Sequence, residues 1–209
     1  LSKQANVVID IGANTGIFTL LSLNLNKNAR VISFEPMAFI AEKLERNLKL
    51  NNLEYELYEF ALSDKESVIE VYSESMNNSY TVALDNKNMK GNVSDYFKLE
   101  MKTKRLDQFI EEHEIKEINL MKIDVERHEP MVLEGMGIYL KKMKPDLLIE
   151  IQTTEIAIKI QELVDGIDYL YFNINDLGDI RHTDKIEKSD YLNYLICSRN
   201  SAKILNLIK

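Results

Sequence analysis

Residues 7–16 read VVIDIGANTG, an apolar run broken by one acid and followed by a turn between two glycines. The apolar run predicts a β-strand that is buried on both faces, as in a parallel sheet. Gly12 and Gly16 permit a tight turn and a close approach of the backbone. After the turn, apolar side chains recur on one face of a helix, at Ile17, Leu20, Leu21 and Leu25. The stretch therefore predicts a strand, a glycine turn and a helix, which form the first unit of an α/β fold.

A second apolar run, residues 31–34, ends directly before Glu35 and Pro36. In an open α/β sheet, ligands bind at the carboxyl ends of the strands. An acid at that position can accept hydrogen bonds from both hydroxyls of a ribose. Glu35 and the glycine turn together predict a site for a ligand that contains a nucleoside.

The glycine spacing distinguishes among such ligands. A dinucleotide site favours G-x-G-x-x-G, and residues 12–16 lack the middle glycine. A P-loop needs Lys and then Ser or Thr after its last glycine, where this chain has Ile17 and Phe18. A carboxylate at Asp10 that points into the cleft favours a cationic ligand such as S-adenosylmethionine over a pyrophosphate. The alternative is structural: Asp10 caps the turn, and the glycines serve only the crossover between strand and helix.

Further blocks of sequence occur in a fixed order along the chain. They are residues 7–16, residues 34–36 (FEP), residues 61–64 (ALSD) and residues 120–136 (LMKIDVERHEPMVLEGM), with residues 105–107 (RLD) just before the last block. In this order they resemble the FkbM-type S-adenosylmethionine-dependent methyltransferases. The resemblance implies a Rossmann-like class I methyltransferase fold of the α/β class, with a seven-stranded, mostly parallel sheet whose last strand is antiparallel. It also implies methylation of a hydroxyl oxygen on a sugar, a glycan or a natural product.

The resemblance also implies roles for individual residues. Glu35 would hold the ribose, residues 61–63 would border the adenine, and Asp10 with the glycine turn would hold the methionine part. The predicted cofactor-binding residues are Asp10, Gly12, Ala13, Asn14, Thr15, Gly16, Glu35, Pro36, Ala61, Leu62, Ser63 and Asp124. Ser63 and Asp64 have a structural alternative, because Ser-Asp pairs are common in ordinary turns. The family usually has glycine where this chain has Arg127.

Methyl transfer to an alcohol requires that the hydroxyl loses its proton, so a base within hydrogen-bond reach assists the reaction. Residues 124–129 read DVERHE and follow a predicted buried strand. We predict Asp124, Glu126 and His128 as catalytic residues. A histidine with an ordinary pKa near ~6.5 is a neutral base at working pH. The alternative for His128 is a cap on the helix that Pro130 begins.

Acidic residues in this part of the chain can also supply oxygen ligands to Mg²⁺, which would lower the pKa of an acceptor hydroxyl. The candidates are Asp124, Glu126, Glu129 and Glu150. Their spacing matches no fixed ligand pattern, so Mg²⁺ is an open alternative and no metal ligand is predicted.

Two basic residues lie near these acids. Lys122 falls in a predicted buried strand, where an unpaired ammonium is costly, so it is expected to pair with a carboxylate such as Glu150. A catalytic role is the alternative for Lys122. Arg127 either reaches an anionic acceptor or points to solvent.

Apolar periodicity predicts the remaining elements. They are a helix with Ile40, Leu44 and Leu48 on its buried face; a strand over residues 55–62; an inserted β-hairpin from residues 68–72, 80–84 and 97–103; strands over 118–124 and 147–151; helices from Pro130 and over 156–164; and an antiparallel pair, 169–174 and 191–197. Residues 77–80 and the polar residues 85–95 predict a cover over the acceptor.

The composition limits the class of protein. With 209 residues, 45% hydrophobic and 29% charged, the chain fits one methyltransferase domain over residues 1–209. A net charge of −8 without a Lys/Arg-rich run favours a small-molecule or glycan acceptor over nucleic acid. A single cysteine, Cys197, and the lack of a membrane span or signal peptide predict a cytoplasmic protein. Because the sequence begins with Leu1, it is also expected to be a piece that lacks an N-terminal segment.

Three rival functions remain open. A module that binds S-adenosylmethionine without turnover would use Arg127 to fill the acceptor pocket. An N-methyltransferase acting on nucleobases would be expected to carry an Asn/Asp-Pro-Pro-aromatic motif, which residues 124–127 do not match. A nicotinamide dehydrogenase would bind NAD in preference.

Overall fold

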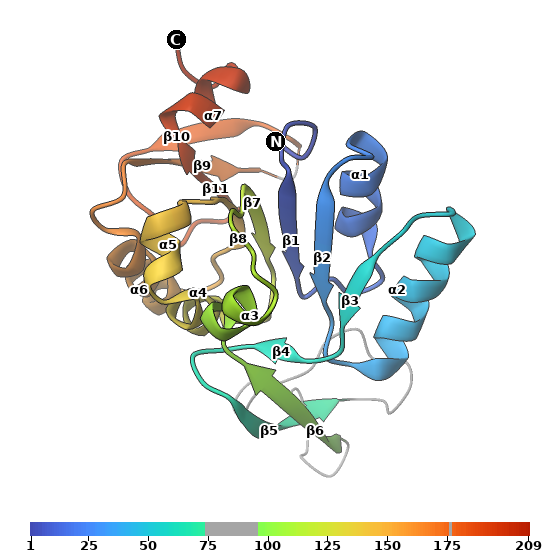
Figure 1. Cartoon of the computed structure of the whole chain (residues 1–209). Coiled ribbons are helices and arrows are strands. Elements are labelled where there is room, and N and C mark those ends of the chain that lie inside the picture. Colours follow the sequence, from blue (N-terminus) through green and yellow to red (C-terminus); the bar gives the residue numbers. More distant parts are fainter. Residues whose placement is uncertain (74–95, 176) are drawn as a thin grey trace.

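The computed structural model describes residues 1–73, 96–175 and 177–209. Its centre is an eight-stranded sheet in the order β10-β9-β11-β8-β7-β1-β2-β3 (Figure 1). The strands are β1 (Val7–Ile11), β2 (Arg30–Phe34), β3 (Glu56–Tyr58), β7 (Leu120–Ile123), β8 (Asp146–Glu150), β9 (Tyr169–Ile174), β10 (Ile180–Thr183) and β11 (Asn193–Ser198). The five strands from β8 to β3 are parallel, whereas β11, β9 and β10 pair antiparallel.

This arrangement confirms the predicted α/β class with a mostly parallel sheet and antiparallel strands at one end. The sheet has one strand more than the seven expected, because β10 adds to the edge beside β9. The sequence of β10, IRHT, contains no apolar run, and three of its four residues are exposed. Charged side chains such as Arg181 are common on edge strands, where they discourage pairing with other chains.

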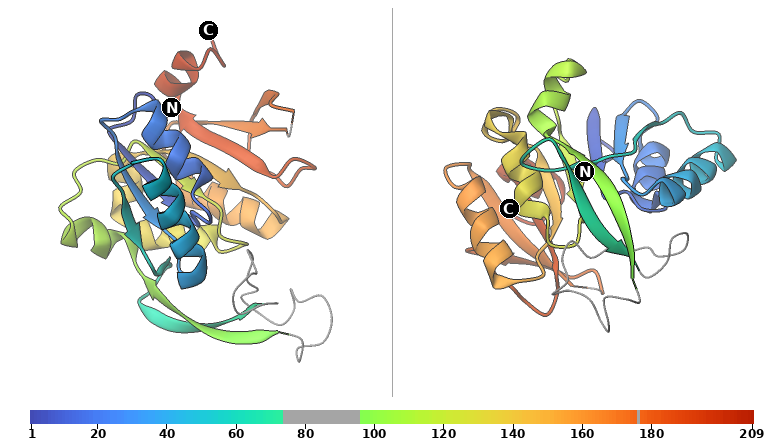
Figure 2. Two further views of the ribbon diagram at one scale, coloured as in Figure 1. Left: turned by 90° about the vertical axis from the view of Figure 1, so that its right-hand side faces the viewer. Right: turned by 90° about the horizontal axis from the view of Figure 1, so that it is seen from below.

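Helices cover both faces of the sheet (Figure 1, Figure 2). They are α1 (Ile17–Leu25), α2 (Ala38–Leu50), α3 (Leu106–Glu112), α4 (Glu129–Met136), α5 (Ile138–Met143), α6 (Thr154–Val164) and α7 (Arg199–Ile204). Side chains of a strand point to alternate faces. Accordingly, Ile9 and Ile11 of β1 pack in the cluster with α3 to α6, whereas Val8 packs in the cluster with Leu44 and Leu48 of α2.

A smaller sheet, in the order β4-β6-β5, lies beyond the edge where the parallel strands end (Figure 1). Its strands are β4 (Ala61–Leu62), β5 (Ser67–Ser73) and β6 (Phe97–Lys104), and β5 and β6 form two arms of the predicted hairpin. The predicted strand over residues 80–84 and the predicted cover, residues 77–80 and 85–95, fall outside the described residues.

The strand expected over residues 55–62 is divided between the two sheets. β3 pairs with β2, and β4 pairs with β6. Between them, the ring of Phe60 packs against Phe34 and Tyr58, with centroid distances of 5.4 Å and 5.9 Å. This aromatic contact fixes the bend, so a run of strand-forming residues changes sheets where the sequence shows no turn signal.

Cys197 is buried as a free thiol. Among the described residues, no helix is both long enough and apolar enough to cross a membrane.

Candidate functional site

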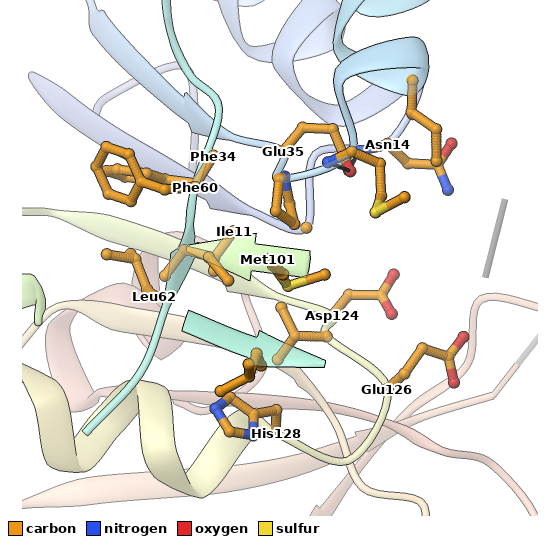
Figure 3. Close-up of a pocket in the computed structure, with 17 residues that line it drawn as sticks. Ile11, Asn14, Phe34, Glu35, Phe60, Leu62, Met101, Asp124, Glu126 and His128 are labelled. Atoms are coloured by element: carbon orange, nitrogen blue, oxygen red, sulfur yellow. Dashed lines mark hydrogen bonds between the residues drawn. The ribbon is translucent and has the colours of Figure 1, made fainter. Parts of the chain in front are cut away.

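A cavity opens at the edge where β1, β2 and β7 end, beside the small sheet (Figure 3). Its polar lining consists of Gly12, Asn14, Glu35, Asp124, Glu126 and His128. Its apolar lining consists of Ile11, Phe34, Pro36, Met37, Ile40, Phe60, Ala61, Leu62, Ile69, Met101 and Val125. The cavity therefore offers an apolar wall to one part of a ligand and hydrogen-bonding groups to another.

The glycine turn is held between the ends of β2 and β7. Backbone N–H groups of Gly12 and Ala13 both donate to the carbonyl of Phe34, at 3.0 Å. Gly12 has φ +72°, and a Cβ there would lie 2.0 Å from the carbonyl oxygen of Asp124. A side chain at this position would push the turn away from β7, so the first glycine of the motif is required by packing as well as by conformation.

Glu35 joins the turn to the start of α2. One carboxylate oxygen accepts the N–H of Asn14 at 2.9 Å, and the other accepts the N–H of Met37 at 3.0 Å. Burial raises the pKa of Glu35, and these two hydrogen bonds oppose that rise. Each carboxylate oxygen has a second lone pair, so both can still accept a hydrogen bond from a ligand in the cavity.

Asp10 does not lie where the sequence analysis expected its carboxylate. The side chain is fully buried, does not line the cavity, and accepts a 2.6 Å hydrogen bond from the hydroxyl of Thr19 in α1. Asp10 lies on the same face of β1 as Val8, because residues two apart on a strand point the same way. This is the face that α1 and α2 cover. Burial raises the pKa of Asp10 above its ordinary value, and the nearby ammonium of Lys122 offsets part of this rise.

Lys122 pairs with carboxylates other than Glu150, which corrects the expected pairing. Its ammonium lies 3.3 Å from Asp124 and 3.7 Å from Asp10, and it donates to the carbonyl of Gly12 at 3.0 Å. The register explains the contact, since Asp10 and Lys122 are direct neighbours across β1 and β7. Lys122 thus ties the glycine turn, the buried Asp10 and the cavity residue Asp124 together.

His128 lines the cavity and precedes α4, but its side chain does not cap that helix. Instead its Nε2 lies 2.9 Å from the hydroxyl of Ser63. Burial lowers the pKa of His128, and the carboxylate of Asp64 opposes this effect. The capping alternative for the side chain is therefore wrong. Ser63, expected beside the adenine, contacts His128 and is not part of the cavity lining.

The loop between β7 and α4 is folded around a buried acid. Glu129 is fully buried, and its Oε1 accepts the N–H groups of Val125 and Arg127, both at 3.2 Å. Its Oε2 is buried and has no hydrogen-bond partner among the described residues. Arg127 has φ +75°, a conformation that favours glycine, which is the residue that the family usually has there.

Gln152, which the sequence analysis missed, connects the acids at the rim. Its amide donates to Glu150 at 2.7 Å and to Glu126 at 3.1 Å, and its carbonyl oxygen accepts a hydrogen bond from Arg127 at 3.1 Å. The apolar residues Ile69 and Met101 were also missed. They are paired across β5 and β6, so only the folding of the hairpin brings them to the cavity, and no local pattern indicates it.

Nine of the predicted site residues line this one cavity: Gly12, Asn14, Glu35, Pro36, Ala61, Leu62, Asp124, Glu126 and His128. The other five do not line it: Asp10 lies in β1, Ala13, Thr15 and Gly16 lie in the glycine turn, and Ser63 directly follows β4. In the part of the chain that the structure describes, no group of three His, Cys, Asp or Glu side chains is placed to hold a metal ion.

The buried acid of this loop gives a prediction for stability. Burial raises the pKa of Glu129 to about 7, from an ordinary value of 4.5. At pH values between about 4.5 and about 7, the folded protein holds this proton and the unfolded chain does not. The free energy of unfolding therefore falls as the pH rises through this range. Glu129→Gln imitates the protonated acid and keeps the Oε1 acceptor. We expect it to raise the free energy of unfolding by about 2 kcal/mol at pH 8 and to have little effect near pH 4.5.

Urea unfolding of both proteins at pH 8, 6 and 4.5 measures this difference. Glu162→Gln, on the exposed side of α6, is the matched control and should show no such trend. An equal effect of Glu129→Gln at all three pH values would show that folding does not raise the pKa of Glu129.

Several known proteins are similar to this chain. A family model described as the methyltransferase FkbM domain matches residues 10–182. AMB antimetabolite synthetase AmbE of Pseudomonas aeruginosa is 32% identical, with coverage of 62% of this chain and 8% of that protein. Methyltransferase 1 of Beauveria bassiana is 27% identical, with coverage of 62% of this chain and 57% of that protein. The matched region thus spans less than two thirds of each of these relatives.

A solved structure is similar in fold. The crystal structure of methyltransferase FkbM from Methylobacillus flagellatus KT superimposes with a TM-score of 0.57 at 15% identity, covering 92% of this chain and 43% of that one. The shared architecture agrees with the order of elements described above and with the class I methyltransferase fold.

Proposed function

The chain belongs to the FkbM family of methyltransferases, and from this premise we propose that it transfers a methyl group from S-adenosylmethionine to a hydroxyl oxygen of a sugar, a glycan or another natural product. One observation carries the proposal. Glu35 is hydrogen-bonded both to the glycine turn, through the N–H of Asn14, and to the apolar lining, through the N–H of Met37. An acid in that position lies between a polar and an apolar compartment of one cavity.

The residues of the cavity fit this donor. Met37, Ile40 and Met101 offer apolar contact to an adenine ring. Glu35 offers two carboxylate oxygens to the ribose hydroxyls. Gly12 and Asn14 line the polar part, next to the exposed carboxylate of Asp124. The polar part carries the negative charge that favours the methionine end of a donor with a positively charged sulfur.

S-adenosylmethionine supplies a methyl group that its sulfonium has already activated. The chain must then hold the acceptor in line and remove its proton. His128 is the base in this proposal, because it lines the cavity and its lowered pKa keeps it neutral at working pH. The carboxylates of Asp124 and Glu126 point to the same open side of the cavity (Figure 3) and are placed to accept hydrogen bonds from acceptor hydroxyls.

The class of acceptor and the location are also proposals. The relative AmbE is named as the synthetase of an antimetabolite, which favours a small natural product as the acceptor. The net charge of −8 disfavours nucleic acid and anionic membrane surfaces as partners. With one buried free cysteine, the protein is suited to the reducing cytoplasm.

The donor site gives a direct prediction. Glu35→Gln keeps the shape of the side chain and removes its charge. A hydrogen bond to a charged group contributes about 1.5–3 kcal/mol, so we expect the Kd for S-adenosylmethionine to rise by about 10- to 100-fold. Isothermal titration calorimetry measures this change. Glu42→Gln, an exposed position on α2, is the control and should bind like the unchanged protein.

A second measurement decides the reaction. The protein is incubated with methyl-labelled donor and a panel of sugars, lipopeptides and polyketides, and the labelled product is analysed for the atom that carries the methyl group. Label on oxygen is the expected result, label on nitrogen would identify an N-methyltransferase, and donor binding without any labelled product would favour a module without turnover. Calorimetry that gives no heat at millimolar donor would exclude the proposal.

A further inference from the structure

The hydroxyl of Ser63 lies between an acid and the candidate base. Its Oγ is 2.9 Å from Oδ1 of Asp64 and 2.9 Å from Nε2 of His128. Ser63 is 4% exposed, so bulk water does not compete for these hydrogen bonds. The three side chains come from the end of β4 and the start of α4, which are far apart in the sequence.

Counting protons assigns the direction of both hydrogen bonds. A serine hydroxyl has one hydrogen, and a carboxylate can only accept. Ser63 donates that hydrogen to Asp64, so its oxygen is left to accept from His128. A neutral imidazole carries one hydrogen, which must therefore be on Nε2, and Nδ1 keeps a free lone pair.

Surrounding contacts hold Ser63 in this position. Its N–H donates to the carbonyl of Lys104 at 2.9 Å, and Arg105 donates to the carbonyl of Asp64. From the other side, Gly135 of α4 packs directly against the carbonyl of Ser63. The backbone that follows β4 and the last turn of α4 are thus in close contact, so the backbone that carries the Ser63 side chain is held in place.

We propose that Ser63 and Asp64 are positioning residues that fix His128 in the tautomer with its proton on Nε2, so that Nδ1 is the atom that takes the proton of the acceptor hydroxyl. The inference rests on the proposed function for the identity of the reaction. In the described part of the chain, Nδ1 has no hydrogen-bond partner, and the side chain lines the cavity. Nδ1 is therefore the nitrogen that remains for a ligand.

The proposed step moves one methyl group and one proton. The acceptor oxygen forms a bond to the methyl carbon, and the bond between that carbon and sulfur breaks with its electron pair on sulfur. The hydroxyl proton passes to Nδ1, so the positive charge of the sulfonium ends on the imidazolium of His128. Asp64 stabilises that imidazolium through Ser63, which is a reason for an acid at this position.

Nitrogen-15 NMR of the ring nitrogens tests the tautomer without donor or acceptor. The chain has three histidines, and His128→Gln identifies the signals of His128 by their loss. Above the pKa of His128, we expect the directly bonded proton on Nε2. In Asp64→Asn, the new amide can donate to Ser63, whose hydrogen then turns to Nε2, so the proton should move to Nδ1 in most molecules. A proton on Nδ1 of the unchanged protein, or no response to Asp64→Asn and Ser63→Ala, would overturn the proposal.

Kinetics test the consequence for catalysis. General bases contribute roughly 10²- to 10⁴-fold, and a base in mixed tautomers loses part of that, so we expect Ser63→Ala to lower kcat about tenfold with an unchanged KM for the donor. Ser67→Ala is the matched control, because it removes a serine hydroxyl that bonds to Thr103 away from His128. Equal kcat in Ser63→Ala and Ser67→Ala would overturn the base at Nδ1. If no methyl transfer occurs at all, the proposed function fails, and the NMR result still decides the tautomer.

Discussion

Replacing Lys122 with methionine should lower the free energy of unfolding at pH 7 by about 3–5 kcal/mol, the usual cost of leaving a buried charge without its partner. Asp10 is fully buried, and one of its oxygens has no hydrogen-bond partner among the described residues. The ammonium of Lys122, 3.7 Å away, is the cation beside it. Methionine fills the space of the lysine stem without the charge, so the carboxylate of Asp10 loses its compensation while packing changes little.

The pH dependence has a definite sign. Lys122 lowers the pKa of Asp10, which burial raises, so its removal raises that pKa further. As the pH falls, a carboxyl whose pKa is raised by folding takes up its proton in the folded protein before it does so in the unfolded chain. The free energy of unfolding therefore increases as the pH falls. The deficit of Lys122→Met should therefore shrink from pH 7 toward pH 4.

Urea unfolding measures the effect, and two variants serve as controls. Lys159→Met removes a half-exposed lysine that lies 3.4 Å from Glu134, and a surface pair of this kind contributes about 0–1 kcal/mol. Combining Lys122→Met with Asp10→Asn removes the charge that needs compensation and should recover most of the loss. If the double variant were as unstable as Lys122→Met alone, the ion pair would not be the cause.

Gly135→Ala should destabilise the protein by about 3 kcal/mol, although alanine ordinarily favours a helix over glycine by about 1 kcal/mol. A Cβ at this position would lie 2.0 Å from the carbonyl oxygen of Ser63. That neighbour is backbone, so relief requires α4 to move away from β4. Because the same movement separates Ser63 from His128, methyl transfer should fall together with stability.

A second glycine separates packing from conformation. Gly166→Ala places a methyl group in open space, but the residue has φ +74°, so only conformational strain opposes it. We expect a loss of about 1 kcal/mol there, measured by the same urea unfolding. Equal losses for the two variants would show that the contact with the carbonyl of Ser63 costs less than expected, because α4 can move to accommodate the methyl group.

Patterns within a few residues of one another predicted the main features of the fold. The apolar run over residues 7–11, the glycine turn and the acid after β2 are local, because a parallel strand, its turn and its ligand edge follow one another in the chain. The cavity contains Glu35 and His128 for this reason. The orientation of Asp10 could not be predicted, because alternation puts Asp10 on the same face as Val8 but, in a strand buried on both faces, does not indicate which face borders a ligand.

Other features depend on contacts between distant segments, and no local pattern encodes them. The hydrogen bond between Ser63 and His128 exists because α4 packs on β4. Gln152 bridges Glu126 and Glu150 because β7 and β8 are neighbours with a particular register. The division of residues 55–62 follows from the ring contacts of Phe60. Each requires the tertiary structure before it can be seen.

The apolar side of the cavity is built partly by a separate hairpin, since Ile69 of β5 and Met101 of β6 belong to the small sheet and not to the central one. Neither β5 nor β6 pairs with a strand of the central sheet. Substitutions along the hairpin can consequently redesign one side of the ligand chamber while the scaffold that presents Glu35 and the glycine turn stays intact. For engineering, the insert is the part of this protein to diversify, and the parallel strands are the part to leave alone.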